Sequence, residues 1–424
     1  MDSKIDKKYN IIVAHPGKQH SFELAEALKK EGLLFKYITT VYLKDKSITK
    51  IIYERLLKGN SFKKAATRKS LALDDNDVLQ INEFYGLITL LLSRIHFLKK
   101  IYLHWSGWVA SNFYKKVMKY AKLNKVDAVI VYDGYSNKHF EILNESNIIK
   151  IMDVSIAARK YLKNIFKQEI EKYNVKDIKA EHYEYWNPKM AQNDIKAISE
   201  SDYFLVPSEF VKNSLVYCGI NKKRIQKVPY GVNVNKFKPN YKSKSDNNLN
   251  LIYVGQINYR KGIHHLLKVV SSMKNVNLSL CGVYDENSML YQKYKNNKNI
   301  KFEGFITRDI LEKKYQEADV FVLASLGEGL ALVGLEALAC GLPLICTENT
   351  GVNDIIINYE NGIVIPTSNE DALYDAINWF ICNLESLPQI KKKARESALK
   401  YTWENYHTNV IVAIENIMKN REKK

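Results

Sequence analysis

The chain has 424 residues, of which 46% are hydrophobic and 26% are charged, and its formal net charge is +18. These proportions are those of globular proteins, and the length is sufficient for two domains with separate cores. The composition argues against a long disordered tract. The most apolar run, Leu87 to Leu92, is too short to span a bilayer, for which about 20 apolar residues are needed. We therefore expect any contact with a membrane to be peripheral.

The N-terminal residues and the cysteines indicate a cytoplasmic protein. The first eight residues are charged and lead directly into an apolar segment, unlike a signal peptide. The five cysteines show no metal-ligand spacing, so we expect buried free thiols in a reducing compartment. The predicted location is the cytoplasm, either free or peripheral on the inner face of the membrane.

Positive charge is concentrated near the N-terminus. Residues 1–150 contain 26 Lys and Arg against 15 Asp and Glu, and the stretch from Lys44 to Lys69 is the densest. A basic surface attracts nucleic acid or anionic lipid, but no nucleic-acid-binding signature accompanies it. Apolar, aromatic and basic residues are mixed in Ile51 to Leu57 and Leu87 to Tyr102, as in helices on membrane surfaces. Lipid contact and a solvated basic surface both remain open.

Short β-branched runs alternate with helical patterns, which is typical of parallel α/β layers. In the first half we expect one clear helix, Phe22 to Lys30. The predicted strands of that half are Asn10 to Ala14, Phe35 to Thr40, Ala128 to Tyr132, Ile148 to Met152, Tyr203 to Val206 and Ile225 to Pro229. A polar, lysine-rich stretch with little apolar content then predicts a linker at residues 236–248.

A second α/β set follows this linker. Its predicted strands are Leu249 to Val254, Leu278 to Cys281, Ile300 to Glu303, Val320 to Leu323 and Pro343 to Cys346. Its predicted helices are His264 to Met273, Ile310 to Glu317, Leu332 to Cys340 and Asp371 to Asn383. The tail is predicted to be helical and amphipathic from Trp403 to Lys419.

These patterns predict two doubly wound, Rossmann-like domains that face each other across a cleft. We expect one at residues 1–235 and the other at 249–402, with a helix in 403–424 packed back on the first. In such sheets ligands bind at the carboxyl ends of the strands. The loops selected by that rule are His15 to His20, Asp133 to Asn137, Asp153 to Ala157, Gln256 to Gly262, Gly282 to Asp285 and Ser325 to Ala331.

Glu328 and Glu336 are the most informative pair of residues. Glu328 lies in a loop of small residues after an apolar strand, and Glu336 lies in an apolar helix, where a charge is costly without a polar partner. That partner could be a backbone N–H or a lysine. The start of the helix, however, also offers unpaired N–H groups and a positive dipole end, which suit a phosphate. We interpret the segment as an anion site flanked by two acids.

The segment Gly255 to Gly262 also joins a predicted strand to a predicted helix. Gly255 allows the backbone to pass close to a ligand, and Arg260 and Lys261 can bind phosphate oxygens. A basic pair in a loop is usually solvated. Its expected position at the same sheet edge as the Glu328 loop favours a ligand role.

The sequence resembles a known family, the retaining glycosyltransferases of family 4, which have the GT-B fold. Several motifs of that family occur in this chain in the same order. The resemblance covers about Ser201 to Trp403, and the first 200 residues are similar mainly in architecture. The motifs that carry it are Gly255 to Gly262, Pro207 to Lys212, Val228 to Asn233 with Phe237 and Pro239, and the pair Glu328 and Glu336.

The resemblance implies a UDP- or GDP-linked sugar donor held mainly by the second domain, an acceptor on the first, and no cofactor or metal. Glu336 would bind the ribose hydroxyls and Glu328 the donor sugar, while Arg260 and Lys261 would offset the charge of the departing diphosphate. Gly17 would approach the phosphate or the acceptor. The backbone amides implied to hold the sugar and diphosphate are those of Gly329, Leu330, Ala331 and Leu332.

The sequence departs from this family at three places. Gln256 stands where the family commonly has arginine, and Arg260 could compensate. Leu330-Ala331 replaces a Phe-Gly pair, which matters little if only backbone contacts count. Where the family often has a histidine after the strand Ile148 to Met152, this chain has Asp153. Asp153 either bonds a sugar hydroxyl near the reacting centre or caps a helix.

Two other groups of residues could be read as metal sites. His15 and His20 have no third ligand at a matching spacing, so we expect one of them to contact the acceptor or a phosphate, or to make a plain loop contact. The triplet Asp75-Asn76-Asp77 matches the acid pair that binds manganese in the other major glycosyltransferase fold. We interpret it mainly as a surface turn.

The leading hypothesis is a retaining, metal-independent enzyme of the hexosyltransferase type. It would transfer a sugar from a nucleotide-sugar donor to a glycan or lipid-linked acceptor in bacterial surface polysaccharide synthesis. One alternative is a sugar transferase with a soluble acceptor. Another is a catalytically silent nucleotide-sugar binding subunit.

Overall fold

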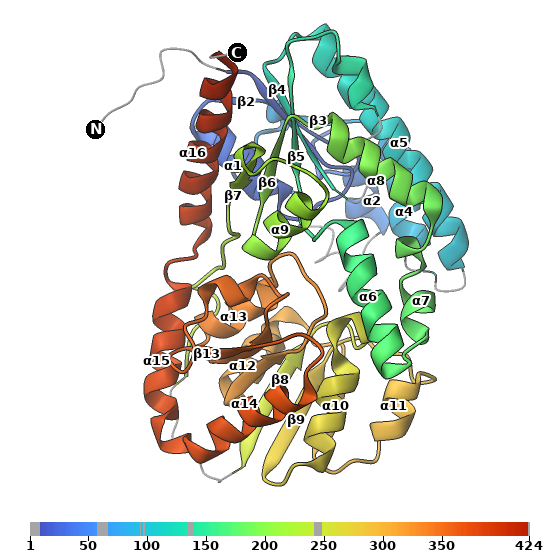
Figure 1. The fold of residues 1–424 in the computed structure, drawn as a ribbon. Helices are drawn as coiled ribbons and strands as arrows, with labels where there is room; N and C mark the ends of the chain where they lie inside the picture. Colours follow the sequence, from blue (N-terminus) through green and yellow to red (C-terminus); the bar gives the residue numbers. More distant parts are fainter. Residues whose placement is uncertain are drawn as a thin grey trace.

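A computed structural model describes residues 9–56, 67–93, 95, 98–133, 139–240 and 248–422. Figure 1 shows two α/β bodies, one above the other, each built around its own sheet. Neighbouring strands in both sheets pair in parallel. The predicted fold class, two Rossmann-like parallel-sheet domains, is confirmed.

The upper sheet has seven strands in the order β3-β2-β1-β4-β5-β6-β7. Strands β1 and β4 are buried along their whole length because helices cover both faces of the sheet. The bounds of the strands are β1 Ile11–Ala14, β2 Leu34–Thr39, β3 Val78–Gln80, β4 Ala128–Tyr132, β5 Ile149–Asp153, β6 Tyr203–Val206 and β7 Ile225–Lys227.

The helices of this first body form its two outer layers. The longest is α5, whose residues Phe113 and Val117 pack in one cluster with Ile12 of β1 and Val129 of β4. The bounds are α1 Ser21–Lys30, α2 Ile48–Leu56, α4 Glu83–Leu92, α5 Lys99–Leu123, α6 Arg159–Tyr173, α7 Asp177–Glu181, α8 Pro188–Glu200 and α9 Glu209–Tyr217.

The lower sheet has six strands in the order β10-β9-β8-β11-β12-β13. Its strands are β8 Leu249–Val254, β9 Val276–Cys281, β10 Ile300–Gly304, β11 Val320–Leu323, β12 Leu344–Thr347 and β13 Gly362–Ile365. Its helices are α10 Ile263–Ser272, α11 Met289–Tyr294, α12 Arg308–Glu317, α13 Leu332–Ala339, α14 Glu370–Cys382 and α15 Leu387–Ala398. In both sheets the carboxyl ends of the central strands face the junction between the two bodies (Figure 1).

Helices cross between the two bodies in both directions. The last helix, α16 (Trp403–Glu422), leaves the lower body and runs along α1 of the upper one (Figure 1). There His407 Nε2 lies 3.0 Å from Glu23 Oε2. In the opposite direction, α6 and α7 extend down from the upper body to the lower one, where α7 contacts the short 3-10 helix η6 (Tyr259–Lys261). The predicted linker lies partly outside the described residues, because 241–247 are not among them.

In the described part of the chain, no helix combines the length and the apolar character needed to cross a bilayer.

Candidate functional site

The segment between β8 and α10 carries the predicted cation pair. Gly262 has a φ of +65°, and a Cβ on it would lie 1.8 Å from the carbonyl oxygen of Ala324, at the end of β11. Only glycine fits this approach. The side chain of Asn258 accepts a hydrogen bond of 3.1 Å from Lys261 N and caps η6. The loop is thereby fixed beside the end of the neighbouring strand, as the strand-end rule predicts.

Arg260, Lys261 and Glu328 form one buried charge cluster. Arg260 Nη1 lies 3.3 Å from Glu328 Oε2 and donates to the carbonyl oxygen of Gly327 at 2.9 Å. Lys261 Nζ contacts the other oxygen of the same carboxylate. Burial by itself raises the pKa of Glu328, but the two cations outweigh it and hold that pKa at about 2. The three predicted residues therefore meet, and Glu328 is ionised at neutral pH.

Glu336 lies in the second turn of α13, away from this cluster of three. The hydroxyl oxygen of Tyr315 is 3.4 Å from Glu336 Oε2. Burial raises the pKa of Glu336, and the positive charge of Arg308 opposes this only in part. The N-cap of α13 is Ala331, whose side chain cannot accept a hydrogen bond. The N–H of Ala331, one of the predicted anion ligands, already donates to the carbonyl oxygen of Thr350 at 3.2 Å, so an anion at this helix start would rely on the neighbouring amides.

Gly329 lies where the two bodies touch. Ser208 Oγ of the upper body donates to the carbonyl oxygen of Gly329 at 2.7 Å. A Cβ on Gly329 would lie 1.7 Å from the carbonyl oxygen of Ser155, also of the upper body. This loop therefore contacts the upper body directly, between Glu328 and the predicted amide ligands of residues 330–332.

Asp153, at the end of β5, faces a histidine of the upper body. His20 Nε2 lies 3.1 Å from Asp153 Oδ2, and both side chains are buried. The alternative role of Asp153 as a helix cap is wrong, because Ala158 is the N-cap of α6. Gly17 is in the same β1–α1 loop as His20, and its N–H donates to His15 Nδ1 at 2.8 Å. That contact occupies the amide that the resemblance would direct to a phosphate or acceptor.

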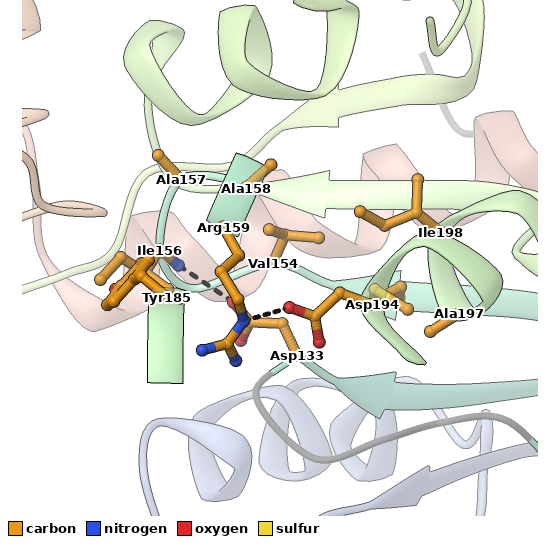
Figure 2. Close-up of a pocket in the computed structure, with 11 residues that line it drawn as sticks. Asp133, Val154, Ile156, Ala157, Ala158, Arg159, Tyr185, Asp194, Ala197 and Ile198 are labelled. Atoms are coloured by element: carbon orange, nitrogen blue, oxygen red, sulfur yellow. Dashed lines mark hydrogen bonds and ion pairs between the residues drawn. The ribbon is translucent and has the colours of Figure 1, made fainter. Parts of the chain in front are cut away.

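A cavity of about 70 Å³ lies at the ends of β4 and β5. Figure 2 shows residues that line it, among them Asp133, Arg159, Tyr185 and Asp194. Arg159 and Asp194 form an ion pair across it. Asp133 accepts hydrogen bonds from Ser155 Oγ at 2.6 Å and from Ile156 N at 3.2 Å. Burial raises the pKa of Asp133 to about 6. Because Ile156 lines the cavity and its neighbour Ser155 contacts Gly329, the cavity adjoins the Glu328 loop.

The sequence predicts Asp133 only as the first residue of a strand-end loop. Its position directly after β4 is the signal that could identify it as a residue of the site. Most of the loop predicted at Asp133 to Asn137 lies outside the described residues, which resume at 139. The triplet Asp75-Asn76-Asp77 is a 3-10 helix beside the edge strand β3. Asp77 there is paired with Lys29 at 2.6 Å, as expected of a surface turn.

The chain was compared with known proteins. Residues 234–397 match the family model described as glycosyl transferases group 1. The chain is 26% identical over 337 residues to an uncharacterized glycosyltransferase of Methanocaldococcus jannaschii, covering 74% of this chain and 80% of that one. It is 32% identical over 205 residues to the capsular polysaccharide biosynthesis glycosyltransferase CapM of Staphylococcus aureus. That match covers 46% of this chain and 53% of CapM, so the chain spans about half of this relative.

Solved structures share the architecture over nearly the whole chain. Sucrose-phosphate synthase from Thermosynechococcus elongatus superposes with a TM-score of 0.65 at 17% identity, covering 97% of this chain and 100% of that one. HepE of Anabaena in complex with UDP and glucose superposes with a TM-score of 0.60 at 13% identity, covering 96% and 99%. These structures share the two-domain GT-B fold with this chain. The family model and the sequence relatives are those of glycosyltransferases.

Proposed function

We propose that the protein is a retaining, metal-independent glycosyltransferase that moves a hexose from a nucleotide-sugar donor to a glycan or lipid-linked acceptor of a bacterial surface polysaccharide. The buried cluster of Arg260, Lys261 and Glu328, next to the start of α13, is the observation that carries this proposal. HepE binds UDP and glucose, and CapM acts in capsular polysaccharide biosynthesis. These relatives support a nucleotide-sugar donor and a surface glycan product.

Each cluster residue has a role in this proposal. Arg260 and Lys261 would stabilise the negative charge that grows on the diphosphate as it leaves, because buried cations act strongly on developing charge. In the structure Glu328 is paired with both Arg260 and Lys261. An incoming diphosphate would bind the same two cations, which would free a carboxylate oxygen of Glu328 to accept hydrogen bonds from the sugar hydroxyls. Glu336 would bind the ribose hydroxyls, and the backbone amides from Gly329 to Leu332 would hold the diphosphate and sugar.

The upper body would present the acceptor. Asp153, bonded to His20, and Asp133 in the cavity of Figure 2 both end strands that face the Glu328 loop. The departing diphosphate would take the acceptor proton, so that no separate base is needed. Asp153 would contact a sugar hydroxyl near the reacting carbon.

The direct test is turnover with a panel of UDP- and GDP-linked sugars and candidate acceptors. We expect one donor to be consumed only when an acceptor is present, in EDTA as well as without it, with the anomeric configuration retained in the product by NMR. Replacing both Arg260 and Lys261 by Ala should lower kcat about a hundredfold or more. An inverted product would refute the retaining mechanism, and a donor that binds but is never consumed would favour a silent binding subunit.

A specific surface supports a lipid-linked acceptor at a membrane. Helix α4 has the apolar sequence Glu83–Leu92, yet Gly86 is its one buried residue, and Phe84 and Leu91 are 59% and 60% exposed. Trp108 of α5 is 49% exposed, and its ring lies 5.2 Å from that of Tyr85. An exposed aromatic surface of this kind suits the interface of a lipid bilayer. We therefore propose peripheral contact with anionic lipid through α4 and α5.

Part of the basic segment predicted for this contact lies among the described residues. The stretch from Lys44 to Lys69 includes residues 57–66, which lie outside the described ones. Within the described part, α2 precedes that gap and packs against α4, and Ile51 of α2 is exposed. Basic residues beside an exposed apolar surface are complementary to anionic lipid head groups. A soluble acceptor is the alternative.

A further inference from the structure

One carboxylate of the upper body is bonded entirely by the lower body. Glu169 of α6 is only 2% exposed. Its Oε1 lies 2.6 Å from His264 Nε2 and 2.7 Å from His265 Nε2, and its Oε2 accepts a hydrogen bond from Ser368 Oγ. Burial opposes ionisation of Glu169, but these partners lower its pKa to about 2. The ionised carboxylate can only accept, so both histidines donate from Nε2.

The two histidines directly follow the segment that carries the cation pair. They lie in the first turn of α10, three and four residues after Lys261. On the other side of the cations, Tyr259 N donates to Glu181 Oε2 of α7 at 3.0 Å. Acidic side chains of the upper body thus hold the segment at both ends. Arg260 and Lys261 lie between these two attachments.

We propose that Glu169 is a positioning residue that sets the place of Arg260 and Lys261 when the two bodies close. This inference rests on the proposed function of those two cations. Glu169 reaches them through α10, because a shift of His264 and His265 moves the start of that helix and the loop before it. A displacement of about 1 Å at a reacting centre costs roughly a hundredfold in rate. The contact therefore makes the donor-side cations depend on the position of the acceptor-side body.

Both ring nitrogens of His265 lie beside carboxylate oxygens. Its Nδ1 lies 3.0 Å from Glu370 Oε1, and Glu370 is paired in turn with the exposed Lys268. The ring of Tyr173, from α6, lies 4.5 Å from the His265 ring. Glu169, His264 and His265 are also a set that can bind a transition metal. Their oxygen–nitrogen separations are those of charge-assisted hydrogen bonds, which we assign here.

The test compares Glu169→Gln with Glu171→Gln, a matched change at an exposed position of the same helix. For Glu169→Gln we expect kcat to fall by about ten- to hundredfold, with a smaller change in KM for the donor. Hydrogen exchange in residues 259–272 should become faster. The Glu171→Gln variant should match the wild type in all three measurements, and Glu169→Asp should recover part of kcat.

Hydrogen exchange keeps this test separate from the proposed function. If the wild type consumes no donor, faster exchange in residues 259–272 of Glu169→Gln would still support the positioning role. Unchanged exchange and unchanged kcat in a folded Glu169→Gln protein would overturn it. A thermal midpoint measured by circular dichroism identifies a variant that is simply unfolded. Activity lost in EDTA and restored by zinc chloride would overturn the hydrogen-bond assignment in favour of a metal site.

Discussion

Burial makes an ionised Glu328 unfavourable, and two adjacent cations reverse that effect. Arg260 and Lys261 hold its pKa at about 2, below the ordinary value of 4.5. A depressed carboxyl pKa contributes stability that is fully present above the ordinary value and is lost as the pH falls toward the folded value. A difference of this size corresponds to about 3 kcal/mol. Ionised Glu328 therefore stabilises the lower body at neutral pH relative to its protonated form, while burial lowers the pKa of Lys261 and opposes part of this gain.

This argument predicts a pH-dependent effect of Glu328→Gln. At pH 7 the variant should be less stable than the wild type, because it leaves Arg260 and Lys261 without a counter-charge in a buried place. The difference should shrink between about pH 5 and pH 2, where the wild type itself becomes protonated. Urea unfolding at steps of pH measures it, with the exposed Glu385→Gln as the control. A difference that stays constant down to pH 2 would contradict the low pKa.

Glu336 gives a second prediction at the scale of one residue. If it binds ribose hydroxyls, Glu336→Ala leaves them unpaired at a half-buried site, at a cost of about 1–3 kcal/mol. UDP or GDP should then bind roughly tenfold or more weakly by calorimetry. Glu317→Ala, an exposed acid on α12, should bind like the wild type. Equal affinity in Glu336→Ala would remove the ribose role.

The sequence allowed Arg260, Lys261 and Glu328 to be placed at one sheet edge, because each follows a strand with a clear apolar pattern. It did not show that they pair with each other. Glu169 could not be predicted as a neighbour of His265, since that contact joins residues 96 positions apart and neither stands at a strand end. Contacts between two bodies depend on how the bodies dock, and no local pattern encodes that.

At the scale of elements, most strands were predicted closely, and two of the four edge strands were missed. The predictions for β4, β6, β8 and β11 match the structure residue for residue. Strand β3, with three residues, and β13, which begins at a glycine, were missed. Both lie at the edges of their sheets, where fewer contacts demand apolar side chains. The other two edge strands, β7 and β10, were predicted to within two residues, so an edge position alone does not remove the signal.

Helix α4 supports a prediction about lipid. If α4 and α5 contact an anionic membrane, the protein should sediment with anionic liposomes at low salt and less as salt rises, since each nearby basic residue contributes about 1 kcal/mol. Replacing Phe84, Leu91 and Trp108 by Ser should weaken this binding, and the same change at Ile357 and Tyr359, exposed on the lower body, should not. No binding to anionic liposomes even at low salt would favour a soluble acceptor.

At the scale of the whole molecule, the proposed activity depends on how closely the two bodies approach each other. Near the site the backbone carbonyl oxygen of Ser155 lies against Gly329, whose own carbonyl oxygen accepts a hydrogen bond from Ser208 Oγ. Glu209 N also donates to Asp354 Oδ2 across the same junction at 2.9 Å. The contact is therefore sensitive to one added carbon atom. Such sensitivity allows closure to be tested separately from the folding of either body.

Gly329→Ala provides that test. The backbone of Gly329 is not in the left-handed region, so alanine suits the lower body alone, but its Cβ would lie 1.7 Å from the Ser155 oxygen. We expect the bodies to stand further apart, with a larger radius of gyration by X-ray scattering and a loss of about a hundredfold in kcat/KM. Gly107→Ala, where nothing lies within 4 Å of the new Cβ, is the matched control. Because UDP or GDP would be held by the lower body, its affinity should change little in either variant. Wild-type scattering and turnover in Gly329→Ala would show that catalysis does not need the closed contact.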